Sequence, residues 1–191
     1  VHINNIANWC GIDFFNEERN PINNAKKLYI DGKEADSIVI PEGVERIGKF
    51  AFPNLKTIKS ISIPKSMKKI CGISANTLLT DVYYAGTTVE YAEIENWDSQ
   101  IMKIATIHCQ DTTMDSILGK LGENAVWGLK NYVFRVHGSG SIDGDSTKNI
   151  NWTGACTLQI TGDIKEISTN AFRGFKNLRT VELPDSIEKI G

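Results

Sequence analysis

The sequence predicts an α/β fold rich in β-structure, built as a solenoid of two short arrays of 23-residue repeats with caps. Three observations predict this fold. A proline or its equivalent recurs every 23 residues, apolar residues recur at fixed distances on both sides of it, and an Ala-Phe pair follows in both halves of the chain. A single repeat of this kind cannot bury its apolar side alone, whereas stacked repeats bury a continuous core.

The period is marked by Pro41 and Pro64 in the first half and by Thr161 and Pro184 in the second, 23 residues apart in each half. Apolar residues follow each marker at the third and sixth positions. They are Val44, Met67, Ile164 and Ile187, and then Ile47, Ile70, Ile167 and Ile190. The pairs Ala51-Phe52 and Ala171-Phe172 follow at the tenth and eleventh positions. Agreement at so many positions indicates a true internal repeat.

Each marker is preceded by the pattern apolar-x-x-apolar-x-apolar, which predicts a short strand. Residues two apart on a strand point to the same face, so Ile61 and Ile63 point inward while Ser60 and Ser62 point outward. Five copies of the pattern are present. Their last two apolar residues are Ile38 and Ile40, Ile61 and Ile63, Val82 and Tyr84, Leu158 and Ile160, and Val181 and Leu183. A proline suits the end of such a strand because it donates no ladder hydrogen bond.

The segment between the arrays breaks the period, because 76 residues separate Ala85 from Thr161. An amphipathic helix over 88–97, with Tyr91, Ile94 and Trp97 on one face, and a strand over 105–109 are expected to cap the first array. A polar link, a strand over 127–137 and a Gly/Ser/Asp-rich loop over 138–152 follow. The predicted domains are 1–112, with an N-terminal cap, and 113–191, with a cap and a second array.

Composition excludes several classes of protein. The 191 residues carry 21 Lys and Arg against 23 Asp and Glu, so no basic field favours nucleic acid or an anionic membrane. No apolar run is long enough to span a membrane. Four cysteines, at 10, 71, 109 and 156, are too few for a disulfide scaffold and are expected to be buried core thiols.

Catalytic, metal and cofactor sites are not predicted. His108 and Cys109 are neighbours on a predicted strand, so they point to opposite faces and cannot act as a base and nucleophile together. The loop that begins at Asp143 alternates oxygen-bearing residues as a calcium loop does, but Lys148 stands where such a loop needs glycine. Asn151-Trp152-Thr153 matches a glycosylation acceptor, while Trp152 is expected in the core of the cap.

The string I-P-x-x-V/I-x-x-I-G/S-x-x-A-F, followed by L/I-x-x-V/I-x-L/I-P, resembles the BspA-like leucine-rich repeats of surface proteins from host-associated bacteria. The segments around Trp9 to Asn20 and around Val82 to Cys109 are similar to those that flank such arrays. The sequence departs from the family at Leu55 and Phe175, which stand where cysteine is usual. The resemblance implies a leucine-rich-repeat solenoid, a location at the cell surface or outside the cell, and attachment to other macromolecules without catalysis or cofactor.

The expected function is therefore non-catalytic adhesion to host or neighbouring-cell macromolecules through the outward face of the strand ladder. Solenoids use extended sheet faces for recognition, and small uncharged residues suit a protein or glycan surface better than a phosphate backbone. The candidate partner-binding residues are Ser37, Val39, Ser60, Ser62, Asp81, Tyr83, Thr157, Gln159, Thr180 and Glu182. Two alternatives stay open: a structural stalk or spacer, and an accessory module of a larger surface hydrolase.

The last repeat stops before its Ala-Phe pair, so Ile187 and Ile190 are expected to point into a core whose next layer is missing. Solenoid ends normally carry a polar cap, and we expect the natural array to continue. A monomer is expected, with the C-terminal rung open to end-to-end contact.

Overall fold

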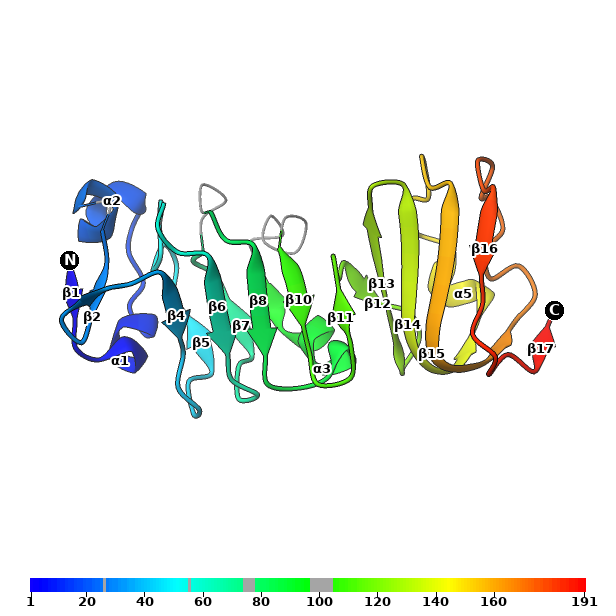
Figure 1. Cartoon of the computed structure of the whole chain (residues 1–191), viewed down its shortest axis with the longest axis horizontal. Coiled ribbons are helices and arrows are strands. Elements are labelled where there is room, and N and C mark those ends of the chain that lie inside the picture. Colours follow the sequence, from blue (N-terminus) through cyan, green and yellow to red (C-terminus); the bar gives the residue numbers. More distant parts are fainter. Residues whose placement is uncertain (26, 55, 74–77, 97–104) are drawn as a thin grey trace. The chain divides into compact units, whose positions relative to one another are not determined.

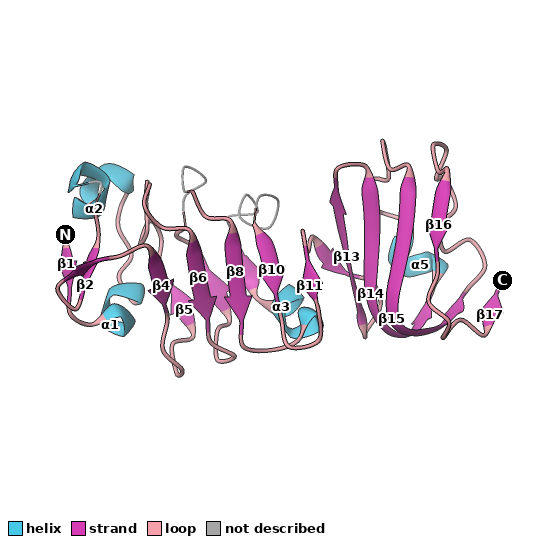
Figure 2. Cartoon of the chain, in the orientation of Figure 1, coloured by secondary structure: helices cyan, strands magenta, loops and turns pink. Residues whose placement is uncertain are grey.

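The computed structural model describes residues 1–191 except 26, 55, 74–77 and 97–104. The described chain forms two units, residues 1–87 with 93–113 and residues 88–92 with 114–191. Short strands make up most of the regular structure, and no described helix is longer than six residues (Figure 2). The chain is thus β-rich, as predicted, while the domain assignment 1–112 and 113–191 stays a prediction.

The first unit begins with a small three-stranded sheet and short helices. Asn20 is fully buried there, and its side-chain amide donates to the carbonyls of Phe50 (2.7 Å) and Ala51 (3.0 Å), which ties this segment to the first repeat. Burial also raises the pKa of the Cys10 thiol to about 12. The elements are β1 His2–Ile3, α1 Ile6–Cys10, η1 Glu17–Arg19, α2 Pro21–Ala25, β2 Tyr29–Ile30 and β3 Lys33–Glu34.

The predicted repeat strands lie side by side in one sheet of the first unit, in the order β11-β10-β8-β6-β4 (Figure 1). The four strands β4, β6, β8 and β10 are parallel. Their central residues Ile38, Ile61, Val82 and Ile107 pair in register, and each is at most 2% exposed. The bounds are β4 Ser37–Val39, β6 Ser60–Ile63, β8 Asp81–Tyr84, β10 Thr106–His108 and β11 Thr113–Met114.

A second parallel ladder explains the apolar residue at the sixth position of each repeat. Strands β5 Arg46–Ile47, β7 Lys69–Ile70 and β9 Glu95–Asn96 pair in that order, and Ile47 pairs with Ile70. Both isoleucines are buried. Repeats one period apart are also joined by surface ion pairs, among them Lys68 to Glu45 at 2.6 Å. Both strand ladders of the first unit therefore follow the sequence period.

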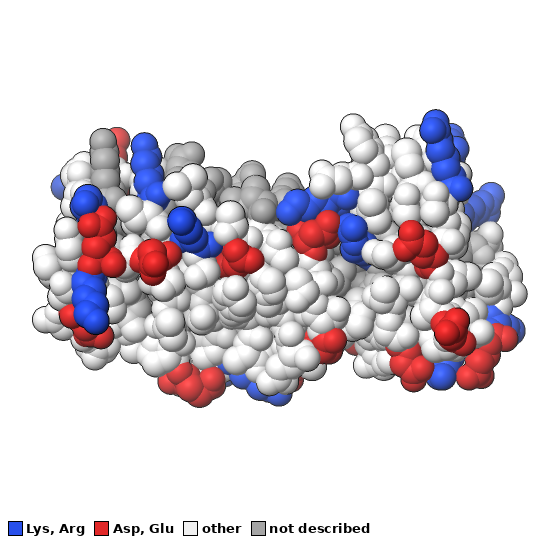
Figure 3. Space-filling view, in the orientation of Figure 1, with Lys and Arg blue, Asp and Glu red and all other residues white. Residues whose placement is uncertain are grey.

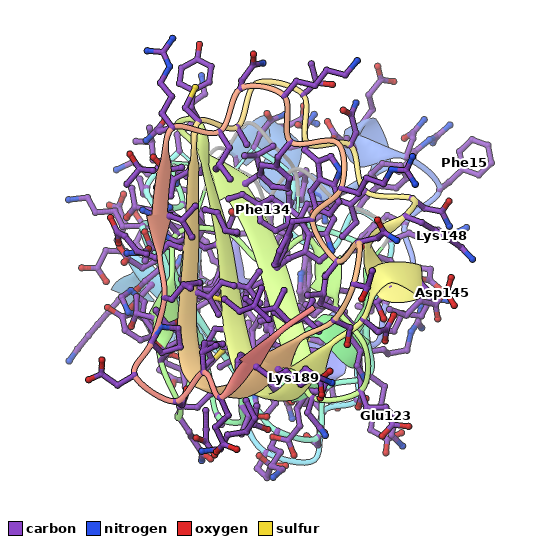
Figure 4. The ribbon with its side chains drawn as sticks, turned by 90° about the vertical axis from the view of Figure 1, so that its right-hand side faces the viewer. Phe15, Glu123, Phe134, Asp145, Lys148 and Lys189 are labelled. Atoms are coloured by element: carbon purple, nitrogen blue, oxygen red, sulfur yellow. The ribbon has the colours of Figure 1, made fainter. Side chains whose placement is uncertain are left out.

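The second unit has longer strands in one sheet, in the order β12-β13-β14-β15-β16, with β17 also paired to β15. Strands β14 and β15 are parallel over their whole length and enclose an apolar core around Phe134, which Figure 4 shows among the side chains of the interior. The elements are β12 Gly119–Lys120, β13 Ala125–Lys130, β14 Val133–Ile142, α5 Gly144–Thr147, β15 Thr157–Ile167, β16 Thr180–Glu182 and β17 Lys189–Ile190.

Two predictions for the second unit are wrong. The single strand expected over 127–137 is an antiparallel hairpin, because Asn131 and Tyr132 both take positive φ (52° and 64°) and form the tight turn between β13 and β14. The glycine-rich start of the expected loop over 138–152 continues β14 as far as Ile142. Glycine is required there: a Cβ on Gly162 would lie 2.2 Å from the carbonyl oxygen of Gly138 on the paired strand.

Three further expectations need correction. The helix over 88–97 ends at Glu93 as α3, Thr88–Glu93, although Tyr91 and Ile94 are buried as predicted; Trp97 lies outside the described residues. Among the cysteines only Cys10 is buried, and the other three are partly exposed. Val181 (50% exposed) and Leu183 (40%) are not core residues, because β16 lies at the edge of its sheet.

Candidate functional site

The outward face of the first sheet consists of two rows of side chains that the strand register aligns. One row contains Ser37, Ser60, Asp81 and Thr106, and the other contains Val39, Ser62, Tyr83 and His108. The six residues predicted for this unit therefore do lie on neighbouring strands of one face. Over β4, β6 and β8 this face is largely uncharged in its lower part (Figure 3).

Two apolar side chains are conspicuous in the second row. Val39 is 65% exposed and Tyr83 is 47% exposed, while Ser62 lies between them on β6. Two strand spacings, about 9–10 Å, separate the backbones of β4 and β8. Because the serine side chain is small, a slot with an aliphatic wall and an aromatic wall opens above it.

Tyr83 is held by the neighbouring strand. Its ring stacks on the ring of His108, with centroids 4.6 Å apart and planes inclined by 13°. His108 is itself fixed, since Nε2 lies 2.7 Å from Asp81 Oδ1 and Nδ1 lies 3.2 Å from Thr113 Oγ1. The aromatic wall is therefore ordered before any partner binds, which lowers the entropy lost on binding.

The Asp81 carboxylate supports this arrangement through charge. Hydrogen bonds from His108 and from the Thr80 hydroxyl (2.7 Å) hold the pKa of the Asp81 carboxyl below its usual value. Both carboxylate oxygens are thus engaged within the face. Asp81 orients His108, and its charge is partly satisfied before any ligand is bound.

An open groove of about 300 Å³ adjoins Tyr83 at the carboxyl ends of β4, β6 and β8. Glu42 supplies the charged side chain of its lining, and most of the remaining lining is apolar. The lining residues are Ile40, Glu42, Ser62, Ile63, Pro64, Tyr83, Tyr84 and Ala85. The groove extends the slot above Ser62 into a longer depression on the same face.

The outward face of the second unit is a hydrogen-bonded polar strip. Arg135 donates to Gln159 Oε1 (2.9 Å) and to Asp115 Oδ2 (2.7 Å), and Gln159 donates to Glu182 Oε2 (2.7 Å). The predicted residues Gln159 and Glu182 are thus brought together. Thr157 and Thr180 pair on the same two strands.

Sequence reasoning missed Thr106 and His108 in the first unit and Arg135 and Asp115 in the second. His108 follows Tyr83 by 25 residues, and its neighbour Ile107 pairs with Val82. A search for apolar-flanked strands at slightly longer spacing finds β10 as a fourth strand of the ladder. Arg135 carries no such signal, because the hairpin that aligns it lies outside the period.

Within the described residues, no three His, Cys, Asp or Glu side chains gather as a metal ion requires. Asp143 instead caps α5: its carboxylate accepts from the amide (2.6 Å) and hydroxyl (2.8 Å) of Ser146. The amide hydrogen bond lowers the pKa of the Asp143 carboxyl. Beside α5, Asp145 and Lys148 point outward and pair with each other at 3.2 Å (Figure 4).

A family model described as the BspA type leucine rich repeat region matches residues 26–96 and 149–191 in six copies, and the chain belongs to this family. A leucine-rich repeat protein from Bacteroides ovatus has a similar solved structure, with 17% sequence identity and a TM-score of 0.31. The match covers 86% of this chain and 36% of that protein, and no argument rests on it. No curated protein matches this sequence.

Membership identifies the general class of function. Repeats of this family generally mediate protein interaction or adhesion, are typically surface-associated and are generally non-catalytic. Among the described residues, every helix is too short to cross a lipid bilayer.

Proposed function

We propose that this chain is a non-catalytic adhesion module of a bacterial cell-surface protein, whose two repeat arrays are solenoids and whose sheet face binds a host or neighbouring-cell macromolecule. One observation carries the proposal: Val39 and Tyr83 are exposed on either side of Ser62, beside a groove. Exposed apolar side chains grouped on one face are typical of interaction sites, and an ordered aromatic ring is a common centre of binding energy.

Cell binding of the fluorescently labelled chain, measured by flow cytometry on epithelial cells and on unrelated bacteria, tests the proposal. Tyr83→Ala should lower binding about tenfold, since central aromatic residues contribute roughly 1–2 kcal/mol or more. Phe15→Ala is the matched control, because Phe15 is 90% exposed and points away from the body of its unit (Figure 4). It should bind as the wild type does.

Treatment of the cells identifies the class of partner. Binding lost after protease treatment indicates a protein, and binding lost after periodate indicates a glycan. A wild-type chain that binds no better than Tyr83→Ala would instead favour the structural stalk or spacer, in which the sheet face is merely solvated.

A further inference from the structure

A second recess lies in the second unit, away from the outward sheet face. It has a volume of about 240 Å³ and is formed by two loops, one before β15 and one before β16. The first loop contributes Asn151, Trp152 and Thr153, and the second contributes Gly174, Lys176 and Asn177. Neither the repeat period nor the proposed adhesion face accounts for it.

Trp152 is fixed at the base of this recess. Its ring contacts Phe175 (centroids 4.6 Å apart) and Phe134 (5.1 Å) within the core of the unit. Gly174 takes a φ of 104°, which favours glycine, and a Cβ there would lie 3.8 Å from Trp152 Nε1. The missing side chain leaves the indole N–H edge open, and among the described residues Nε1 has no acceptor.

The polar groups around this edge are mainly hydrogen-bond donors. Trp152 Nε1 and the Lys176 ammonium can only donate. Asn151 Oδ1 already accepts from the Thr153 amide (3.0 Å), which leaves its NH₂ group available. Asn177 and the Thr153 hydroxyl can both donate and accept. The lining contains no carboxylate, so the recess favours a ligand rich in acceptor oxygens.

The loop over 168–179 adds positive charge. It carries Arg173, Lys176 and Arg179 and no Asp or Glu. Within the described chain none of these three forms an ion pair, whereas Lys165 and Lys189 do pair with acidic residues. Blue side chains gather around this loop at the upper edge of the second unit (Figure 3). An uncompensated positive field attracts an anion.

We propose that this recess binds an acidic sugar, a saccharide ring that carries a carboxylate or sulfate group. Lys176 and the Trp152 N–H bind the anionic group, and Asn151, Thr153 and Asn177 hydrogen-bond to the ring hydroxyls, which need donors and acceptors together. A short recess between two loops suits one ring better than an acidic peptide, which needs an extended groove or a free strand edge.

The full chain tests this proposal by isothermal titration calorimetry with trigalacturonate for the carboxylate and a heparin-derived disaccharide for the sulfate. Maltotriose is the neutral control, and triglutamate represents an acidic peptide. We expect one or both acidic saccharides to bind, with an affinity that falls as salt rises, and to shift the Trp152 Nε1–H resonance in ¹H–¹⁵N NMR spectra. Maltotriose and triglutamate should do neither.

Substitutions separate a specific site from general charge. Lys176→Gln should lower the affinity about fivefold, as expected for one ion pair at a surface. Lys33→Gln removes the same charge from exposed β3 and should change nothing. Tyr83→Ala should bind the acidic sugar normally, so a failure of the adhesion proposal is distinguishable from a failure here. Equal binding of maltotriose, tighter binding of triglutamate, wild-type affinity in Lys176→Gln, or no saccharide-dependent shift would each overturn the proposal.

Discussion

The two units use the same apolar period to build their cores but present different outward faces. In the first unit, strands of three or four residues expose a slot between Val39 and Tyr83. In the second, strands of ten and eleven residues carry a strip in which Arg135, Gln159 and Glu182 are already bonded to one another. A face whose apolar groups lack neighbours is available to a partner, whereas one whose polar groups are satisfied gains less from binding. The comparison therefore favours the first unit as the adhesion face.

The largest expected effect tests the inward and outward assignment of β6 in the first unit. Ile61 is 1% exposed and Ser62 points outward. Ile61→Asp buries an unpaired carboxylate and should lower the free energy of unfolding by about 3–5 kcal/mol. Ser62→Asp should change it by less than about 1 kcal/mol. Urea denaturation followed by circular dichroism measures both, and equal losses would show that the strand register is shifted by one residue.

A glycine pair compares the backbones of the two units. Gly43 and Gly162 have the same φ, 88°, but a Cβ on Gly43 meets nothing within 4 Å while one on Gly162 meets the Gly138 carbonyl. Gly43→Ala should therefore lose only about 1–2 kcal/mol from the strained φ. Gly162→Ala should lose clearly more, because the β14–β15 ladder must also separate. Thermal unfolding of both variants provides the measurement, and similar midpoints would contradict the close approach of these strands.

Sequence predicted the inward residues better than the face. Ile61, Ile63, Val82 and Ile160 are buried as their spacing requires, because the period of an apolar pattern follows directly from strand geometry. The positions of Ser62 and Tyr83 on one face follow from the same geometry. The stacking of Tyr83 on His108 does not, because β10 stands outside the 23-residue spacing. The hairpin at Asn131 and Tyr132 was also not predicted, since two non-glycine residues there take positive φ.

Acid should affect the two units through different carboxylates. The folded-state pKa of Asp81 lies below its usual value of 3.8, chiefly because of His108. Its stabilisation is therefore complete above that value and is lost as the pH falls through the folded-state pKa. His108→Ala should lower the stability near neutral pH and flatten the loss between about pH 4 and pH 2.

Asp143 in the second unit serves as the reference for this pH dependence. Its pKa is also lowered, by the Ser146 amide, and His108→Ala leaves that hydrogen bond in place. The chemical shifts of the two side-chain carboxyl carbons, followed by NMR, report each titration separately. In His108→Ala, only the Asp81 midpoint should move upward toward 3.8. A movement of both midpoints would mean that the substitution disturbs more than the Asp81–His108 pair.

The smallest expected effect concerns the polar strip itself. Gln159 links Arg135 to Glu182 across three strands, so Gln159→Ala removes two hydrogen bonds from a half-buried position. The loss should be about 0.5–1.5 kcal/mol, because water replaces part of what is removed. Ser62→Ala is the counterpart in the first unit; within the described chain its hydroxyl has no partner, so the loss should be near zero. If Gln159→Ala is equally silent in urea denaturation, the strip is as open to exchange with a ligand as the first face, and the second unit becomes an equal candidate for adhesion.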